Sequence, residues 1–197
     1  MRRVAVAPGL VLDDEMYAAT AHVLEERAPE WAHRLTWEVF TTRKSWVLVP
    51  DAERPDEPFH KAELVVLNEE PWTHMLMLSV WHSPDSRKNG TPLPYSHPWP
   101  CDEYVAVGGF AEDRYHVGPG GGVIGPERHV YQAGDVNHLS LTDFREVTEI
   151  LVPDCTLTVM DCGPRKKGPW GYLDPRTGVY TPVFKQPLSD RSSQFKQ

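Results

Sequence analysis

The sequence predicts an all-β protein, an antiparallel sandwich or barrel, with helix confined to its N-terminal part. Two observations lead to this prediction. One segment alone, residues 13–35, has apolar side chains at helical spacing. The remainder consists of short strand-like runs separated by proline, glycine and aspartate. Strands that follow one another without intervening helices form antiparallel sheets rather than a parallel sheet with crossover helices.

The helical segment begins at an acidic pair. Asp13 or Asp14 can cap the helix, and Met16, Val23 and the alanines between them supply its apolar face. Pro29 lacks a backbone N–H group, so we expect it to end or bend the helix.

The predicted strands follow in quick succession. They are LTWEVF, SWVLV, ELVVL, HMLMLSVWH, EYVAVGGF, DRYHV, RHVYQ, DVNHLSL, REVTEILV, CTLTVMDC and WGYL. Two polar, proline-rich loops, residues 50–62 and 83–94, interrupt them. We expect one domain over residues 1–197, with a helical segment at about 13–35, a barrel core at about 36–175 and a polar tail at about 186–197.

Composition narrows the function classes. Hydrophobic content of 40% and charged content of 24% are ordinary for a soluble globular protein. A net charge of -8 argues against nucleic acid as a partner, because binding to a phosphate backbone requires a basic surface. Three cysteines without a CxxC pair favour a reducing compartment. No targeting or membrane-spanning segment is evident, so we expect a cytoplasmic protein that acts on a small molecule.

The stretch YSHPWPCDEYVAVGGFAE, residues 95–112, carries candidate metal ligands. In a strand Tyr95 and His97 share a face, and Asp102 follows after an irregular PWPC segment. The glycine pair at 108 and 109 permits a tight turn that returns the chain antiparallel. Downstream, a glycine turn at Gly134 precedes a strand carrying His138.

These two stretches resemble the cupin superfamily, whose jelly-roll barrel carries two such motifs. The first motif runs His-x-His, then Glu, then Gly, and here Tyr95, His97, Asp102 and Gly109 stand at those places. The second motif is matched by a glycine turn and His138. The resemblance spans residues 75–172 and departs from the pattern twice, with tyrosine for the first histidine and aspartate for glutamate.

The resemblance implies a mononuclear metal site formed by His97, Asp102 and His138. Two imidazoles and one carboxylate are the facial triad of non-haem Fe(II) oxygenases, so Fe(II) is the expected metal, with zinc or manganese as alternatives. Neutral tyrosine is a poor ligand, so Tyr95 is expected beside the metal as a catalytic acid or base. The need for 2-oxoglutarate stays undetermined.

Four further residues are candidates for substrate binding. Trp99 stands two residues from His97 and could wall a pocket. Arg114 and His116 share a face, and if that face is inward Arg114 could clamp a carboxylate. Arg165 follows a Gly-Pro turn where an anion could bind. Each of these also has a purely structural interpretation, as packing or as a solvated charge.

Three functions are therefore open. The favoured one is an Fe(II)-dependent dioxygenase acting on a small polar metabolite. The second is a lyase or isomerase, for example an epimerase or decarboxylase, that uses zinc, manganese or acid–base residues. The third is a non-catalytic cupin that binds a small ligand. Sheet edges that need covering also allow a homodimer.

Overall fold

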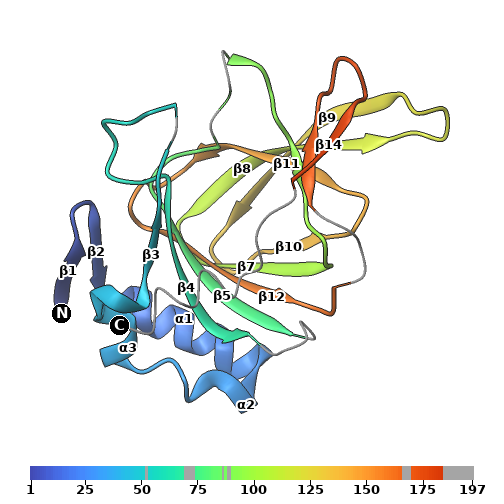
Figure 1. Ribbon diagram of the computed structural model, residues 1–197. Coiled ribbons are helices and arrows are strands. Elements are labelled where there is room, and N and C mark those ends of the chain that lie inside the picture. The colour runs from blue at the N-terminus through green and yellow to red at the C-terminus, as the bar shows by residue number, and fades with distance from the viewer. Residues whose placement is uncertain (52, 69–73, 86, 88–89, 166–169, 184–197) are drawn as a thin grey trace.

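The structure is a computed structural model that describes residues 1–51, 53–68, 74–85, 87, 90–165 and 170–183. Its described part contains two six-stranded antiparallel sheets, a separate two-stranded hairpin and three α-helices (Figure 1). The predicted polar tail from Gln186 lies outside the described residues.

The N-terminal part holds the hairpin and the helices. Its elements are β1 (Arg3–Ala7), β2 (Leu10–Asp13), α1 (Asp14–Arg27), α2 (Pro29–Ala32), α3 (Trp37–Thr41) and the 3-10 turn η1 (Arg43–Ser45). The Asp13 carboxylate accepts hydrogen bonds from the backbone N–H groups of Glu15 and Met16, as expected of a helix cap. Pro29 begins α2, so the predicted helix is divided there. The prediction of a strand at LTWEVF is wrong, because the Thr36 hydroxyl caps a short helix.

The first sheet has the strand order β10-β7-β12-β5-β4-β3. Its strands are β3 (Val47–Val49), β4 (Lys61–Asn68), β5 (Met75–Trp81), β7 (Cys101–Val107), β10 (Val136–Leu139) and β12 (Thr156–Cys162). The second sheet has the order β14-β13-β6-β11-β8-β9. Its strands are β6 (Tyr95–Ser96), β8 (Gly109–Val117), β9 (Val123–Gln132), β11 (Phe144–Ile150), β13 (Gly171–Leu173) and β14 (Tyr180–Pro182).

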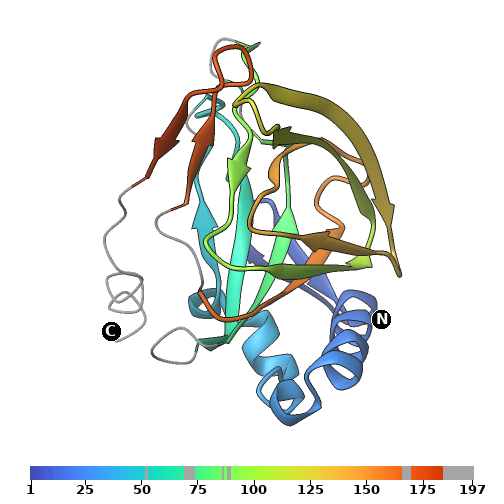
Figure 2. The same ribbon diagram turned by 90° about the vertical axis from the view of Figure 1, so that its right-hand side faces the viewer.

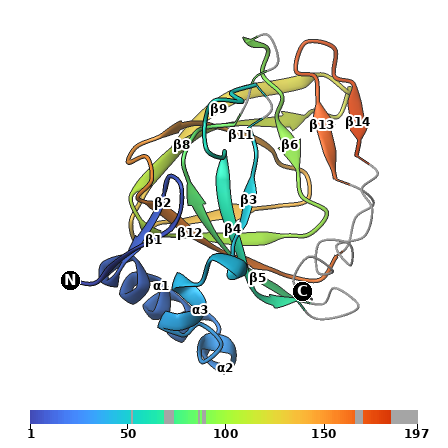
Figure 3. The same ribbon diagram turned by 60° about the vertical axis from the view of Figure 1, so that its left-hand side comes forward.

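The two sheets face each other, and the helices lie against the outer face of the first sheet (Figures 1 and 2). Apolar residues of α1 and α3, such as Leu24 and Phe40, pack there against Leu78 and Val159. A second apolar cluster lies between the sheets and joins Trp81 of β5 to Phe110 of β8. Sequence-adjacent strands such as β6 and β7 belong to different sheets, and Figure 3 shows β13 and β14 beside β6. The predicted all-β jelly-roll architecture is confirmed.

Within the described residues, no helix combines the length and apolar character needed to cross a bilayer.

Candidate functional site in the barrel

Strand β7 separates an inner from an outer row of side chains. Val105 packs with Trp81 and Phe110 between the two sheets, so its row faces the barrel interior. Glu103 belongs to the same row, because alternate residues of a strand share a face. Asp102 and Tyr104 belong to the other row, and Tyr104 packs against the helical side of the sheet.

Strand β10 continues this arrangement. It pairs antiparallel with β7, and Asn137 of β10 lies opposite Glu103 of β7. His138 of β10 lies opposite Asp102. Asn137 and Glu103 are completely buried. His138 Nδ1 lies 2.7 Å from Asp102 Oδ1, but the two side chains are 76% and 45% exposed. The carboxylate and imidazole predicted to bind the metal therefore face outward.

His97 does not join this outward pair. It follows β6 in the second sheet, and its ring lies edge-on to Tyr95 at 5.4 Å between centroids. Among the residues that the structure describes, no group of three His, Cys, Asp or Glu side chains could hold a metal ion. The predicted metal set is thus not assembled. A shift of one residue along a strand moves a side chain to the opposite face. Because the PWPC segment before β7 is irregular, alternation counted from His97 does not predict the face of Asp102 correctly.

The barrel interior holds a buried ion-pair network in place of this triad. Arg145 of β11 is 2% exposed at its side chain and bonds through Nη1 to Glu103 Oε2. Its Nε lies 3.1 Å from Oε2 of Glu112, which is itself completely buried. The guanidinium thus bridges carboxylates from both sheets.

Asn137 and Arg114 complete the network. The amide nitrogen of Asn137 donates to Glu112 at 3.0 Å and to Glu103 at 3.5 Å, and its oxygen accepts from Arg114. Arg114 also donates to Glu112 Oε1 at 2.6 Å and to the Tyr131 hydroxyl at 3.1 Å. Two carboxylates therefore meet two guanidinium groups, and their formal charges balance.

Tyr95 faces this network. Its Cα partner on the neighbouring strand is Arg145. Burial raises the pKa of Tyr95 well above its usual range, and the negative charge of Asp85 raises it further, so the phenol is protonated. Burial alone would lower the pKa of Arg145, but the carboxylates of Glu103 and Glu112 raise it well above its usual value.

A second polar group is attached to the same strand β11, through Val147. His60 Nε2 is 3.2 Å from Asp85 Oδ1, and Asp85 Oδ2 accepts from the backbone N–H of Val147 at 2.7 Å. Lys61 Nζ lies 2.9 Å from Glu63 Oε1 and 4.9 Å from the centre of the Trp81 ring. Burial would raise the pKa of Asp85, but the hydrogen bond and charge of His60 lower it overall.

The predicted substrate-binding residues are dispersed. Arg114 does point inward, but its guanidinium clamps the chain's own Glu112. Trp99 is partly buried against the cluster of Cys101, Met160 and their neighbours. His116 is 42% exposed and lies 3.4 Å from Asp143. Arg165 is exposed. The structure does not bring these four side chains to one site.

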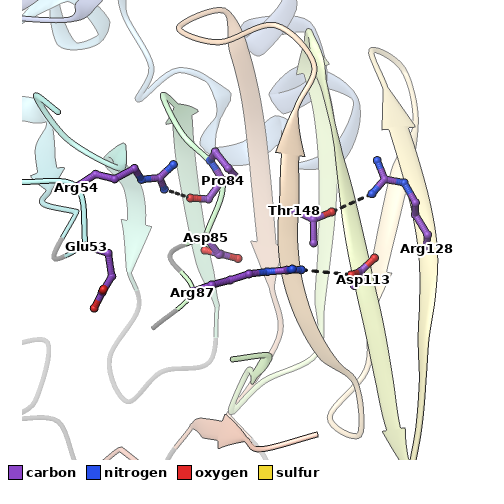
Figure 4. Close-up of a pocket in the computed structure, with 8 residues that line it drawn as sticks. All are labelled: Glu53, Arg54, Pro84, Asp85, Arg87, Asp113, Arg128 and Thr148. Carbon is purple, nitrogen blue, oxygen red and sulfur yellow. Dashed lines mark hydrogen bonds and ion pairs between the residues drawn. The ribbon is translucent and has the colours of Figure 1, made fainter. Parts of the chain in front are cut away.

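A surface pocket of about 510 Å³ lies near this region (Figure 4). Arg54, Arg87 and Arg128 come from separate segments, and acidic side chains lie among them. Each arginine already has a carboxylate partner: Asp51, Glu146 and Glu149 respectively. The pocket is therefore polar without an excess of either charge. Asp85 lines it and also holds His60.

No functional role is predicted from the sequence for Glu103, Asn137 or His60, and no sequence pattern places the Arg145 side chain in the barrel. One signal was present. Counting back by twos from the apolar Val105 places Glu103, and not Asp102, on the buried face. The same count from Leu139 selects Asn137 rather than His138.

No family model matches the chain, and no curated protein matches it. Among solved structures, an RmlC-like cupin protein from Ralstonia eutropha JMP134 superposes with a TM-score of 0.47 and 12% identity, covering 77% of this chain and 80% of that one. KdgF from Halomonas sp. superposes with a TM-score of 0.39 and 18% sequence identity, and the match covers 61% of this chain and 88% of KdgF. The Fe(II) form of HppE superposes with a TM-score of 0.40 and 6% sequence identity, and the match covers 59% of this chain and 55% of HppE. The likeness concerns the cupin fold alone.

Proposed function

We propose that this cupin-fold chain is a metal-independent acid–base enzyme of the isomerase or lyase class. Its substrate would be a small hydroxylated carbonyl compound bound at the inner face of the barrel. One observation carries the proposal: Tyr95 is the Cα partner of Arg145 on β11, and Asp85, which holds His60, bonds to the backbone of Val147 two residues along the same strand. An acid and a base are thus available near one another.

His60 would accept the proton. In neutral His60, the Nε2–H group donates to Asp85 Oδ1 at 3.2 Å. The lone pair is then on Nδ1, where the Ser83 hydroxyl is 3.5 Å away, at the outer limit of a hydrogen bond. That nitrogen can take a proton from the carbon next to a carbonyl group.

Tyr95 would give a proton to the carbonyl oxygen as the carbon loses its own. Its raised pKa keeps the hydroxyl protonated. The Arg145 guanidinium on the adjacent strand would stabilise negative charge developing on that oxygen. His60 can then return the proton to the former carbonyl carbon while Tyr95 recovers a proton from the neighbouring hydroxyl group, which gives an isomer. Alternatively, departure of a leaving group from the next carbon, with Tyr95 recovering its proton as the carbonyl reforms, gives a lyase product.

Two polar atoms favour a substrate that carries hydroxyl groups. Glu103 Oε1 and the Ser79 hydroxyl are buried, and neither has a hydrogen-bond partner among the described residues. A ligand hydroxyl would satisfy such an atom. Solvent reaches the base, because the side chains of His60 and Asp85 keep 12% and 16% exposure.

Hydrogen exchange tests this function without knowledge of the natural substrate. Dihydroxyacetone, glyceraldehyde and pyruvate would be incubated with the protein in D₂O containing EDTA, and proton NMR would follow loss of the hydrogens next to the carbonyl. We expect exchange with at least one probe, and a reduction of about 10²–10⁴ in Tyr95→Phe and His60→Gln. His138→Gln is the matched control, since this histidine also pairs with an aspartate but on the outer face.

Equal rates in wild type and both inner variants would contradict the proposal. An absence of exchange with all three probes would favour the ligand-binding alternative. Elemental analysis of protein purified without added metal tests the alternative function, an Fe(II)-dependent dioxygenase. Near-stoichiometric iron that is lost in His97→Ala would favour that function instead.

A further inference from the structure

We infer that the guanidinium of Arg145 is the resident cation of the barrel and fills the place that a divalent metal would take. The fold family implies a metal, but the donors present do not fit one. Two buried acidic side chains, Glu103 and Glu112, are instead paired with Arg145. Occupancy by a guanidinium does not depend on which reaction the barrel carries out.

The position of Arg145 supports this inference first. Its side chain is 2% exposed, and the two carboxylates that it contacts are 0% exposed. Glu103 comes from β7 of the first sheet and Glu112 from β8 of the second. A cation between them joins the two sheets at the centre of the barrel, where unneutralised carboxylates would be strongly unfavourable.

The orientation of Asn137 supports it second. Its amide nitrogen, a donor, faces both carboxylates, and its oxygen faces Arg114. Divalent cations are bound by amide oxygens and never by amide N–H groups. The side chain nearest the two carboxylates is thus turned in a way that suits hydrogen bonding and opposes metal binding.

The charge balance supports it third. Glu103 and Glu112 contribute two negative charges, and Arg145 and Arg114 contribute two positive charges. A divalent ion added to this set would leave an excess of two positive charges in a buried site. Removal of Arg145 alone leaves an excess of one negative charge and opens space for a small cation.

Manganese binding tests the inference, with Mn²⁺ alone as the probe and electron paramagnetic resonance as the readout. Wild type should leave added Mn²⁺ free in solution. Arg145→Ala should bind one ion at least about 100-fold more tightly than wild type, because Glu103 then lacks its cation and Glu112 keeps only Arg114. Arg145→Lys, which keeps the charge, should bind none, and Arg145→Ala combined with Glu103→Gln should lose the gain.

Wild-type protein that binds one Mn²⁺ ion, with loss of that ion in Glu103→Gln, would overturn the inference whether or not Arg145→Ala folds. A folded Arg145→Ala variant that binds no Mn²⁺ would also overturn it. Circular dichroism establishes which variants are folded. Neither result depends on the hydrogen-exchange assay, so the failure of one proposal is distinguishable from the failure of the other.

Discussion

The two faces of the β7–β10 ribbon carry similar chemistry in opposite surroundings. On the inner face Glu103 and Asn137 are Cα partners and completely buried. On the outer face Asp102 and His138 are also Cα partners, and solvent reaches both. Each face pairs one carboxylate with one nitrogen-bearing side chain. The comparison shows that burial, rather than residue type, decides what such a pair does.

The physical difference is the dielectric surroundings. Between exposed groups, water screens the attraction and hydrates each partner when the pair opens. Inside the barrel no water replaces a lost partner, so each group depends on its neighbours. The inner pair is therefore coupled to Arg145 and Glu112, whereas the outer pair can be changed without consequence for the rest of the fold.

The largest expected effect comes from removing one carboxylate from each face. Glu103→Ala leaves Arg145 with a single carboxylate partner in a buried site, and breaking such a pair costs about 3–5 kcal/mol of unfolding free energy. Asp102→Ala should cost less than about 1 kcal/mol, because its partner is exposed. Urea denaturation of the two variants measures both values. Similar losses in the two variants would remove the distinction between the faces.

A smaller effect is expected from the nitrogen-bearing partners. Asn137→Leu removes an amide that bonds to Glu112, Glu103 and Arg114, and unsatisfied buried groups cost about 1–3 kcal/mol. His138→Leu is the matched change on the outer face and should lower the unfolding free energy by less than about 1 kcal/mol. Thermal and urea unfolding would measure both. A greater loss of unfolding free energy in His138→Leu than in Asn137→Leu would mean that the outer pair, and not the inner one, stabilises the fold.

The fold could be predicted from sequence because its signals are local. Asp13 caps α1 and Pro29 begins α2, and each acts through its own backbone neighbours. LTWEVF, which was predicted as a strand, shows the limit of such signals, and the strands β1, β2 and β14 were not predicted. Its alternating apolar residues are typical of a strand, but Thr36 accepts a hydrogen bond from the Val39 N–H group and begins a helix.

The site could be predicted only in part, because its assembly depends on which face each residue takes. Most of the predicted strands are present, and Gly108 and Gly134 lie at turns with positive φ. Tyr95 was predicted to lie beside a metal, and the structure instead pairs it with Arg145. The sequence predicts Asp102 rather than Glu103 as a ligand, because the phase of β7 is lost across the irregular PWPC segment. It predicts His138 rather than Asn137 because His138 matches the second motif. Partners such as Arg145 and Glu103, 42 residues apart, meet only through the sheet topology, which no local pattern contains.

The smallest expected effect concerns an outer charge cluster and its pH dependence. His82 Nε2 lies 2.8 Å from Glu57, and Nδ1 contacts Asp154. Burial lowers the pKa of His82, but these two carboxylates raise it overall above the ordinary value of 6.5. A histidine whose folded pKa is raised stabilises the protein fully below the ordinary pKa, and that stabilisation is lost as pH rises through the folded value.

We therefore expect wild type to exceed His82→Asn in unfolding free energy at about pH 6, with the difference vanishing by about pH 9. The difference should be only about 0.5 kcal/mol, because Glu57 and Asp154 are 47% and 48% exposed and solvent screens them. Urea denaturation at both pH values measures it. The loss caused by Glu103→Ala should stay nearly constant over this range, because the raised pKa of Arg145 keeps its guanidinium charged. A difference for His82→Asn that grows with pH would reverse the sign assigned to this cluster.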